Sequence, residues 1–172
     1  LINKVLEGSE KLTKTFVPTG IGLNGLAKDF AQEVPTDQPK FNVEEAKKLL
    51  AEGLKEQGLA QLPNLKILLN DTGSRKSIAE YIQENLRNNL GVNVELEVVS
   101  GKERIERTKK RDYQISLQNW TGDFLDPITY LDLFESKNAN NRGDFKNARY
   151  DELTKIVKGS ADPKVRVPAM LE

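Results

Sequence analysis

Apolar residues recur every three to four positions in some segments of the chain and every second position in others. Residues 43–58, "VEEAKKLLAEGLKEQG", have helical spacing and follow Asn42, a good N-cap, so this segment is predicted to form a helix. The apolar run at 64–70 predicts a strand. Apolar residues four positions apart across 74–90 predict a helix, and alternating apolar residues at 92–99 predict a second strand. This order predicts a βαβ unit with parallel strands and a right-handed crossover.

The same order of elements continues with one more helix and strand. Residues 101–112 predict a polar helix, and residues 113–119 predict a third strand. One face of this strand carries Tyr113, Ile115 and Leu117, and the other carries Gln114, Ser116, Gln118 and Trp120. Buried parallel strands are usually apolar on both faces, so we expect this strand to form an edge or a face directed into a wet cleft.

The segments before and after this region are less regular. Residues 9–42 are rich in Gly and Pro, and we expect turns and extended loops there rather than regular elements. Pro127 is predicted at the first position of a helix, and residues 148–159 predict another helix. Asp162 and Pro163 predict the start of the last helix.

Both ends of the chain have the pattern of interrupted helices. "LINKVLEG" has the pattern of the last turns of a helix that ends at Gly8. Near the other end, Pro168 is expected to kink or end the last helix. Because the chain begins without Met and stops inside this pattern, we expect a fragment cut at both ends.

Composition narrows the chemistry that the chain can perform. Lys plus Arg and Asp plus Glu both count 26, so the net charge of zero gives no reason to expect a nucleic acid partner. The chain has no Cys and no His, which removes thiolate and imidazole nucleophiles, Ser-His-Asp triads and nearly every zinc site. No apolar run approaches the ~20 residues of a membrane-spanning helix.

Several longer motifs occur in a fixed order and spacing. The run "NWTGDFLDPITYLDLF" at 119–134 has Trp at a strand end, two small residues, Asp before an aromatic residue, and Asp-Pro before a helix. It follows "FNVEEAKKLLAEGLKEQG" at 41–58 and "SIAEYIQENLRNNLGVNVELEVV" at 77–99, and it precedes "NARYDELTKIVKGSADPKVR" at 147–166. Together these motifs resemble the solute-binding proteins of oligopeptide and dipeptide ABC importers over essentially the whole chain.

The resemblance implies a fold and a set of partners. The fold is expected to be α/β, one lobe of a two-lobed periplasmic-binding-protein-like protein, with a mixed sheet of βαβ units and flanking helices. Residues 1–172 are expected to be a single C-terminal, peptide-binding lobe that lacks the N-terminal lobe of the same protein. The implied partners are an oligopeptide ligand and a cognate ABC permease in the membrane. The implied location is outside the cytoplasm, as a cell-surface lipoprotein or a periplasmic protein.

The resemblance also implies the residues of the binding site. The family's aspartate that pairs with the α-amino group of the peptide is matched by Asp123, and its pocket tryptophan is matched by Trp120. Asn119, Thr121 and Phe124 are expected to complete the ligand pocket. An ammonium that becomes buried needs an opposite charge, and Trp offers a rigid apolar wall with one N–H donor.

These residues also have structural interpretations, which stay open at this point. Asp123 is equally typical of a turn carboxylate, Trp120 of a core residue, and Asn119 of a residue that satisfies its own turn. Asp126, directly before Pro127, is predicted to cap the next helix. Asp151 and Arg166 match family positions that we expect to be structural. Phe16, Phe30 and Phe41 are expected to pack in the core or against a lobe, with ligand contact as the alternative.

Two other classes of function fit the sequence less well, and one alternative fits the same scaffold. An enzyme would use Asp123 and Asp126 as a carboxylate pair, but one such pair without a second acidic cluster or a His makes a poor active site. Asp123, Asp126 and Asp132 are an oxygen-only set that suits Ca²⁺, yet their spacing matches no known loop, so no metal and no cofactor is expected. A signal- or pheromone-peptide receptor on the same scaffold, or a relative that binds nickel, haem or sugar, remains the alternative function.

Overall fold

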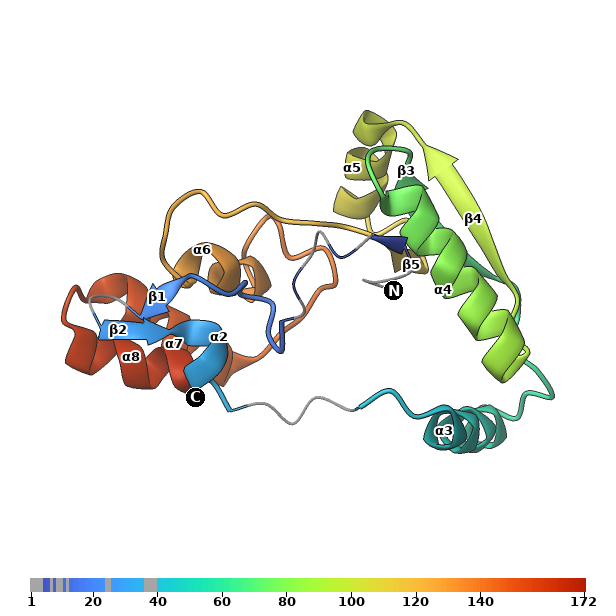
Figure 1. Cartoon of the computed structure of the whole chain (residues 1–172), viewed down its shortest axis with the longest axis horizontal. Helices are drawn as coiled ribbons and strands as arrows, with labels where there is room; N and C mark the ends of the chain where they lie inside the picture. The colour runs from blue at the N-terminus through green and yellow to red at the C-terminus, as the bar shows by residue number, and fades with distance from the viewer. Residues whose placement is uncertain (1–4, 7, 9–10, 12, 24–25, 36–39) are drawn as a thin grey trace. The chain divides into compact units, whose positions relative to one another are not determined.

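The computed structural model describes residues 5–6, 8, 11, 13–23, 26–35 and 40–172 (Figure 1). The chain divides into two compact units, each built from segments that are separated in the sequence. The sheet unit takes residues 1–10 and 39–118, and the helical unit takes residues 11–38 and 119–172.

The sheet unit is organised around a parallel pair of strands joined by a helix. β3 (Leu65–Asn70) pairs in parallel with β4 (Val94–Val99), from Leu65 opposite Val94 to Asn70 opposite Val99. The connection is α4 (Arg75–Leu90), which ends at Gly91 with a φ of 67°, a left-handed conformation that favours glycine. The predicted parallel β-α-β order is therefore confirmed, with boundaries within two residues.

A second connection returns to the opposite side of β3. α5 (Gly101–Lys109) leads to β5 (Ile115–Ser116), which pairs in parallel with β3, so the strand order is β4-β3-β5. All three strands of this sheet are parallel, and the antiparallel pair of the chain is a separate hairpin in the helical unit.

The third strand is much shorter than the predicted range of 113–119. Before it, the amide N–H of Lys66 donates to the side-chain Oε1 of Gln114 at 2.8 Å, so a side chain takes the bond that a longer strand would offer from its backbone. Among the described residues β5 lies at an edge of its sheet, which confirms the edge alternative of the prediction. The other alternative, a wet face, is wrong at Ser116, because its Oγ is buried.

The core of the sheet unit lies between the sheet and its helices. Ile67, Leu69 and Ala79 are at most 2% exposed and form the centre of an apolar cluster with residues of α4. Leu68, on the other face of β3, is 1% exposed. α3 (Val43–Glu56) begins as predicted, with Asn42 Oδ1 accepting from the N–H of Glu45 at 3.1 Å.

The helical unit begins with regular structure where loops were expected. β1 (Gly22–Leu23) and β2 (Leu26–Asp29) pair antiparallel, and α2 (Phe30–Glu33) follows directly. Asp29 stabilises the junction, because its side chain accepts from the N–H groups of Ala31 and Gly20. The expectation of turns and loops across 9–42 is therefore wrong for this segment. Most of the helix end predicted at residues 1–8 lies outside the described residues.

Short and long helices complete the helical unit. They are α6 (Ile128–Leu131), the 3₁₀ helix η1 (Asp132–Phe134), α7 (Ala148–Gly159) and α8 (Pro163–Leu171). Asp162 caps α8 as predicted, by accepting from the N–H of Lys164 at 2.9 Å. Pro168 does not end α8, because the chain remains helical to Leu171 and the N–H of Glu172 donates to the Pro168 carbonyl. The alternative expectation, a kink at Pro168, stays a prediction.

The core of the helical unit gathers side chains from the hairpin, α6, α7 and α8. Its buried members are Val17, Ile21, Leu23, Phe30, Ile128, Tyr130, Val157 and Met170. Tyr150 joins α7 to α6 through a hydrogen bond of 2.6 Å from its hydroxyl to the Leu131 carbonyl. Burial raises the pKa of Tyr150 to about 12, so the phenol is a neutral donor at physiological pH. Within the described part of the chain, no helix has both the length and the apolar content needed to cross a membrane.

We predict that Leu69→Ala destabilises the protein by about 2–5 kcal/mol, because Leu69 is 0% exposed and its truncation leaves a cavity under α4. The matched control is Leu49→Ala on α3, where the side chain is 58% exposed and the loss should stay within about 0.5 kcal/mol. Denaturant unfolding of both variants measures the difference. Equal losses would show that the cluster around Leu69 is not the stabilising core.

Candidate functional site

The segment 120–126, here called the acidic loop, is held in place by two buried side chains of α6. The N–H of Gly122 donates to Tyr130 Oη at 3.2 Å, and the N–H of Asp123 donates to Thr129 Oγ1 at 3.0 Å. Thr129 and Tyr130 are 3% and 8% exposed, so these acceptors are themselves fixed by packing. The loop backbone is consequently anchored rather than free to move in solvent.

Gly122 allows this close approach of the loop to Tyr130. A Cβ atom at position 122 would lie 2.6 Å from Tyr130 Oη, so a larger residue there would require Tyr130 or the loop to shift. The phenol that accepts the hydrogen bond from Gly122 is thus the same group that disfavours a larger residue there.

Asp126 closes the other end of the acidic loop. Its Oδ1 accepts from the N–H of Ile128, the first residue of α6, so Asp126 stabilises the start of the helix as predicted. The predicted positions are wrong by one residue, because Pro127 and not Asp126 occupies the N-cap and the helix begins at Ile128. Both carboxylate oxygens also accept from Nη2 of Arg166, at 2.9 and 2.8 Å. The side chains of Arg166 and Asp126 are only 10% and 16% exposed, so this is a largely buried ion pair. The structural role predicted for Arg166 is confirmed.

Asp123 differs from Asp126 in every one of these respects. The residue is exposed, and among the described residues nothing donates a hydrogen bond to its carboxylate or pairs with it. The turn is stabilised by the backbone N–H of Asp123, not by its side chain. The interpretation of this carboxylate as a turn acceptor therefore has no support from the hydrogen bonds of the loop.

A second carboxylate, Asp132, shares the electrostatic environment of Asp123. Burial raises the pKa of the Asp132 carboxyl above its ordinary value, the charges of Glu135 and Asp123 raise it further, and Lys158 opposes them. Lys158 itself forms an ion pair with Glu135. Asp123 and Asp132 are thus close enough for the charge of one to oppose ionisation of the other.

Trp120 lies half-buried and packs against the core of the helical unit. Its Nε1 is buried and has no hydrogen-bond partner among the described residues. The core interpretation accounts for the apolar part of the ring, and the pocket role stays a prediction. Asn119, Thr121 and Phe124 are all exposed, with Phe124 at 56%. The structure therefore brings all five predicted site residues into one short, largely exposed segment.

The other candidates of the sequence have structural positions. Asp151 accepts from the N–H of Ser136 at 2.8 Å, as expected of a structural residue. Phe30 is buried in the core, and Phe16 stacks edge-on against Phe134 at 5.0 Å between ring centroids. Phe41 is 85% exposed in the sheet unit, so it does not pack in the core, while packing against a lobe and contact with ligand stay predictions.

A calcium site built from Asp123, Asp126 and Asp132 does not form. No group of three or more Asp, Glu, His or Cys side chains suited to a metal ion occurs in the described part of the chain. The physical reason is that both oxygens of Asp126 are already occupied by Arg166.

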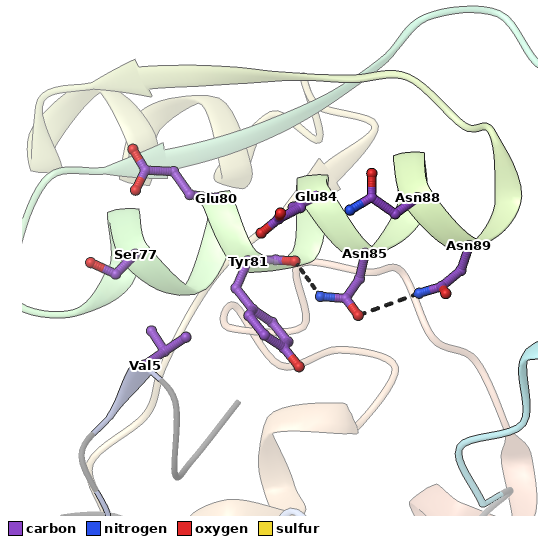
Figure 2. A pocket seen from close by; sticks show the side chains of 8 residues that line it. All are labelled: Val5, Ser77, Glu80, Tyr81, Glu84, Asn85, Asn88 and Asn89. Atoms are coloured by element: carbon purple, nitrogen blue, oxygen red, sulfur yellow. Dashed lines mark hydrogen bonds between the residues drawn. The ribbon is translucent and has the colours of Figure 1, made fainter.

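Sequence patterns gave no sign of a groove that lies in the sheet unit. Figure 2 shows this groove, of about 710 Å³, along the outer side of α4 beside Val5. An amide ladder lines it, in which Asn85 donates to the Tyr81 carbonyl and Asn89 donates to Asn85 (Figure 2). The groove holds glutamate, amide and hydroxyl groups but no arrangement that indicates catalysis. Thr129 and Tyr130 were also missed, since their role depends on contacts across the loop.

Comparison with known proteins places the chain in a family. The family described as "Bacterial extracellular solute-binding proteins, family 5 Middle" matches residues 1–142, and the chain belongs to this family. The resemblance inferred from the motifs and the α/β fold class are thereby confirmed.

Individual relatives agree with this assignment. The dipeptide-binding protein DppE of Bacillus subtilis (strain 168) is 35% identical over 170 residues, which cover 99% of this chain and 31% of DppE. The oligopeptide-binding protein OppA of the same organism is 40% identical over 116 residues, or 65% of this chain and 21% of OppA. The chain thus spans about a third or less of the length of these two relatives.

Solved structures show the same fold. A crystal structure of a peptide ABC transporter, peptide-binding protein, superposes with a TM-score of 0.87 at 31% identity, over 98% of this chain and 75% of that one. Listeria monocytogenes OppA bound to peptide gives a TM-score of 0.85 at 31% identity, over 99% of this chain and 32% of that one.

We predict that Arg166→Met destabilises the protein by about 3–5 kcal/mol, because it leaves the Asp126 carboxylate largely buried without its partner. The matched control is Asp123→Asn, three residues from Asp126 in the sequence. It should change the free energy of unfolding by no more than about 0.5 kcal/mol. Thermal unfolding of both variants tests the contrast. Similar melting temperatures would contradict the role of the ion pair in anchoring the acidic loop.

We also predict that Asp132→Asn raises the melting temperature at neutral pH. The raised pKa means that ionisation of Asp132 costs more in the folded than in the unfolded state. Wild-type stability should fall as pH rises through this raised pKa, whereas the Asn variant should lose nothing there. The gain should disappear below the ordinary pKa range of aspartate. Melting curves between pH 3 and 8 measure it, with the exposed Asp71→Asn as control; a gain that persists at pH 3 would point to a different cause.

Proposed function

We propose that this chain is one lobe of the substrate-binding component of an ABC importer, which captures oligopeptides outside the cytoplasmic membrane and delivers them to a permease. Membership of the solute-binding family supports the transport role, and the names of the relatives support peptides as the ligand. In this proposal the protein is not an enzyme and uses no cofactor. Its partners are the oligopeptide, a second lobe of the same protein, and the membrane permease.

The observation that carries the proposal is the carboxylate of Asp123, which has no partner among the described residues and lies on an anchored, acidic loop. A carboxylate in this setting is suited to the α-amino group of a peptide, which is a cation with three N–H donors. Trp120, beside it in the loop, supplies an apolar wall. Asn119, Thr121 and Phe124 are exposed around these two and supply the remaining contacts.

Main-chain recognition explains how such a site accepts many sequences. An extended peptide that is held through its backbone and its amino terminus is bound by groups that every peptide has. When the two lobes close, water is excluded, and the ammonium–carboxylate hydrogen bond strengthens in the lower dielectric. The proposed location is extracytoplasmic, either as a lipoprotein on the cell surface or in the periplasm.

A peptide-signal receptor is the second candidate function. The pheromone receptor PrgZ superposes with a TM-score of 0.79 at 28% identity, over 98% of this chain and 34% of PrgZ. Such a receptor uses the same scaffold and differs in the ligand. Mass spectrometry of the peptides that co-purify with the full-length protein separates the two, because a nutrient importer should carry many sequences and a receptor should carry one.

We predict that Asp123→Asn weakens the binding of free-amine peptides by about 2–5 kcal/mol, a factor of tens or more, because it leaves the ammonium without its charged partner. The probe is a mixture of synthetic pentapeptides of random sequence, offered with free or acetylated amino termini to the full-length protein. Retained peptides are identified by mass spectrometry, and those retained most are titrated by calorimetry.

Acetylation of the peptide should reduce the binding free energy of the wild type by a similar amount and that of the Asn variant by little, since acetylation and the substitution remove the same interaction. Asp71→Asn, an exposed aspartate of the sheet unit, is the control and should bind like the wild type. Additive losses would assign Asp123 a different role. Retention of no pentapeptide at all by the wild type would overturn the proposed ligand class, which leaves nickel, haem and sugar as the alternatives to test.

A further inference from the structure

Two adjacent apolar side chains stand at the tip of the acidic loop. Phe124 is 56% exposed and Leu125 is 87% exposed. One exposed apolar residue is ordinary on a protein surface. Two bulky ones in succession, between a carboxylate without a partner and a buried ion pair, contribute nothing to the core of the helical unit.

The backbone that carries this pair is fixed. The N–H of Asp123 is bonded to Thr129, the N–H of Asp126 donates to the Phe124 carbonyl at 3.0 Å, and Asp126 is held by Arg166. Phe124 and Leu125 therefore project from a short segment that is anchored on both sides. Binding against such a segment orders little additional chain, which lowers the entropic cost of the contact.

Chain geometry places the pair within reach of whatever Asp123 binds. Consecutive Cα atoms are about 3.8 Å apart, so the Cα of Leu125 lies within about 7.6 Å of the Cα of Asp123. In a peptide, the carbon that bears the amino group also bears the first side chain. A peptide whose ammonium contacts Asp123 consequently brings its first side chain next to this part of the loop.

We propose that Phe124 and Leu125 make the site selective for peptides whose first residue is apolar. This inference rests on the proposed function and adds the chemistry of the first side chain to it. Leu, Ile, Val, Met or Phe at that position removes its own apolar surface and that of the loop tip from water. A neutral polar first residue such as Ser or Asn gains nothing there and gives up part of its hydration.

Charge alone predicts a different selectivity, so the two causes are separable. The carboxylates of Asp123 and Asp132 attract any basic first residue and repel an acidic one. Charge does not distinguish peptides with an apolar first residue from peptides with a neutral polar first residue. That comparison is the measure of the contact with Phe124 and Leu125.

The experiment offers the random pentapeptide mixture to the full-length protein and compares first residues in the retained and input peptides by mass spectrometry. We expect apolar first residues to be enriched about three- to tenfold over Ser, Thr, Asn and Gln, the range for a partly enclosed apolar contact. Leu125→Ser and the double variant Phe124→Ser/Leu125→Ser should lose the enrichment yet still require a free amino terminus. Both positions are exposed, so unchanged melting temperatures are expected.

Leu49→Ser on α3, where the side chain is 58% exposed, is the matched control and should keep the enrichment. Equal retention of apolar and neutral polar first residues by the wild type, or an enrichment that survives both loop variants, would overturn the inference. If binding still depends on the free amine in that case, the proposed function stands and only the selectivity fails. If acetylation of the peptide does not change binding, the proposed contact between Asp123 and the amino terminus is wrong, and the inference about the first side chain loses its basis.

Discussion

The contact between Asp126 and Arg166 is the interaction on which the arrangement of the acidic loop depends. One guanidinium joins three segments, since Arg166 lies in α8, donates from Nε to the Val157 carbonyl of α7, and pairs with a loop residue 40 positions away. A largely buried ion pair adds little net stability compared with an apolar substitute, but a broken one is costly. Its main effect here is to fix the end of the loop, and through the loop the position of Asp123.

Two aspartates three residues apart thereby serve opposite purposes. The Asp126 carboxylate is saturated by an N–H group and a guanidinium, whereas the Asp123 carboxylate is left to the solvent. An exposed carboxylate is hydrated and costs the free protein little, and it can exchange water for a cation when a ligand arrives. Because Asp126 holds the end of the loop, Asp123 lies at a defined place although its own carboxylate has no partner among the described residues.

The sequence predicted those parts of the fold that depend on local chemistry. The β3-α4-β4 unit and the caps at Asn42 and Asp162 follow from spacing and from side chains that bond to their own neighbours. The short β5 did not follow, because Gln114 competes for a backbone N–H of a strand 48 residues away. The β1-β2 hairpin was missed although the sequence Asn-Gly at 24–25 is a strong hairpin signal, since Gly and Pro density was taken as a sign of loops.

The candidate site shows the same boundary between local and long-range information. Motif resemblance singled out this segment, but it could not separate the carboxylate that Arg166 binds from the one that has no partner among the described residues. Nor could it find Thr129 and Tyr130, whose buried hydroxyls hold the loop from the next helix. Those hydroxyls and the ion pair hold the loop in place without a ligand. In the proposed function, the energy of a charge pair and an apolar contact would then be available for affinity rather than for ordering the chain. A loop anchored in this way would discriminate a free amine and a first side chain, while the rest of the proposed peptide ligand would be recognised through groups common to all peptides.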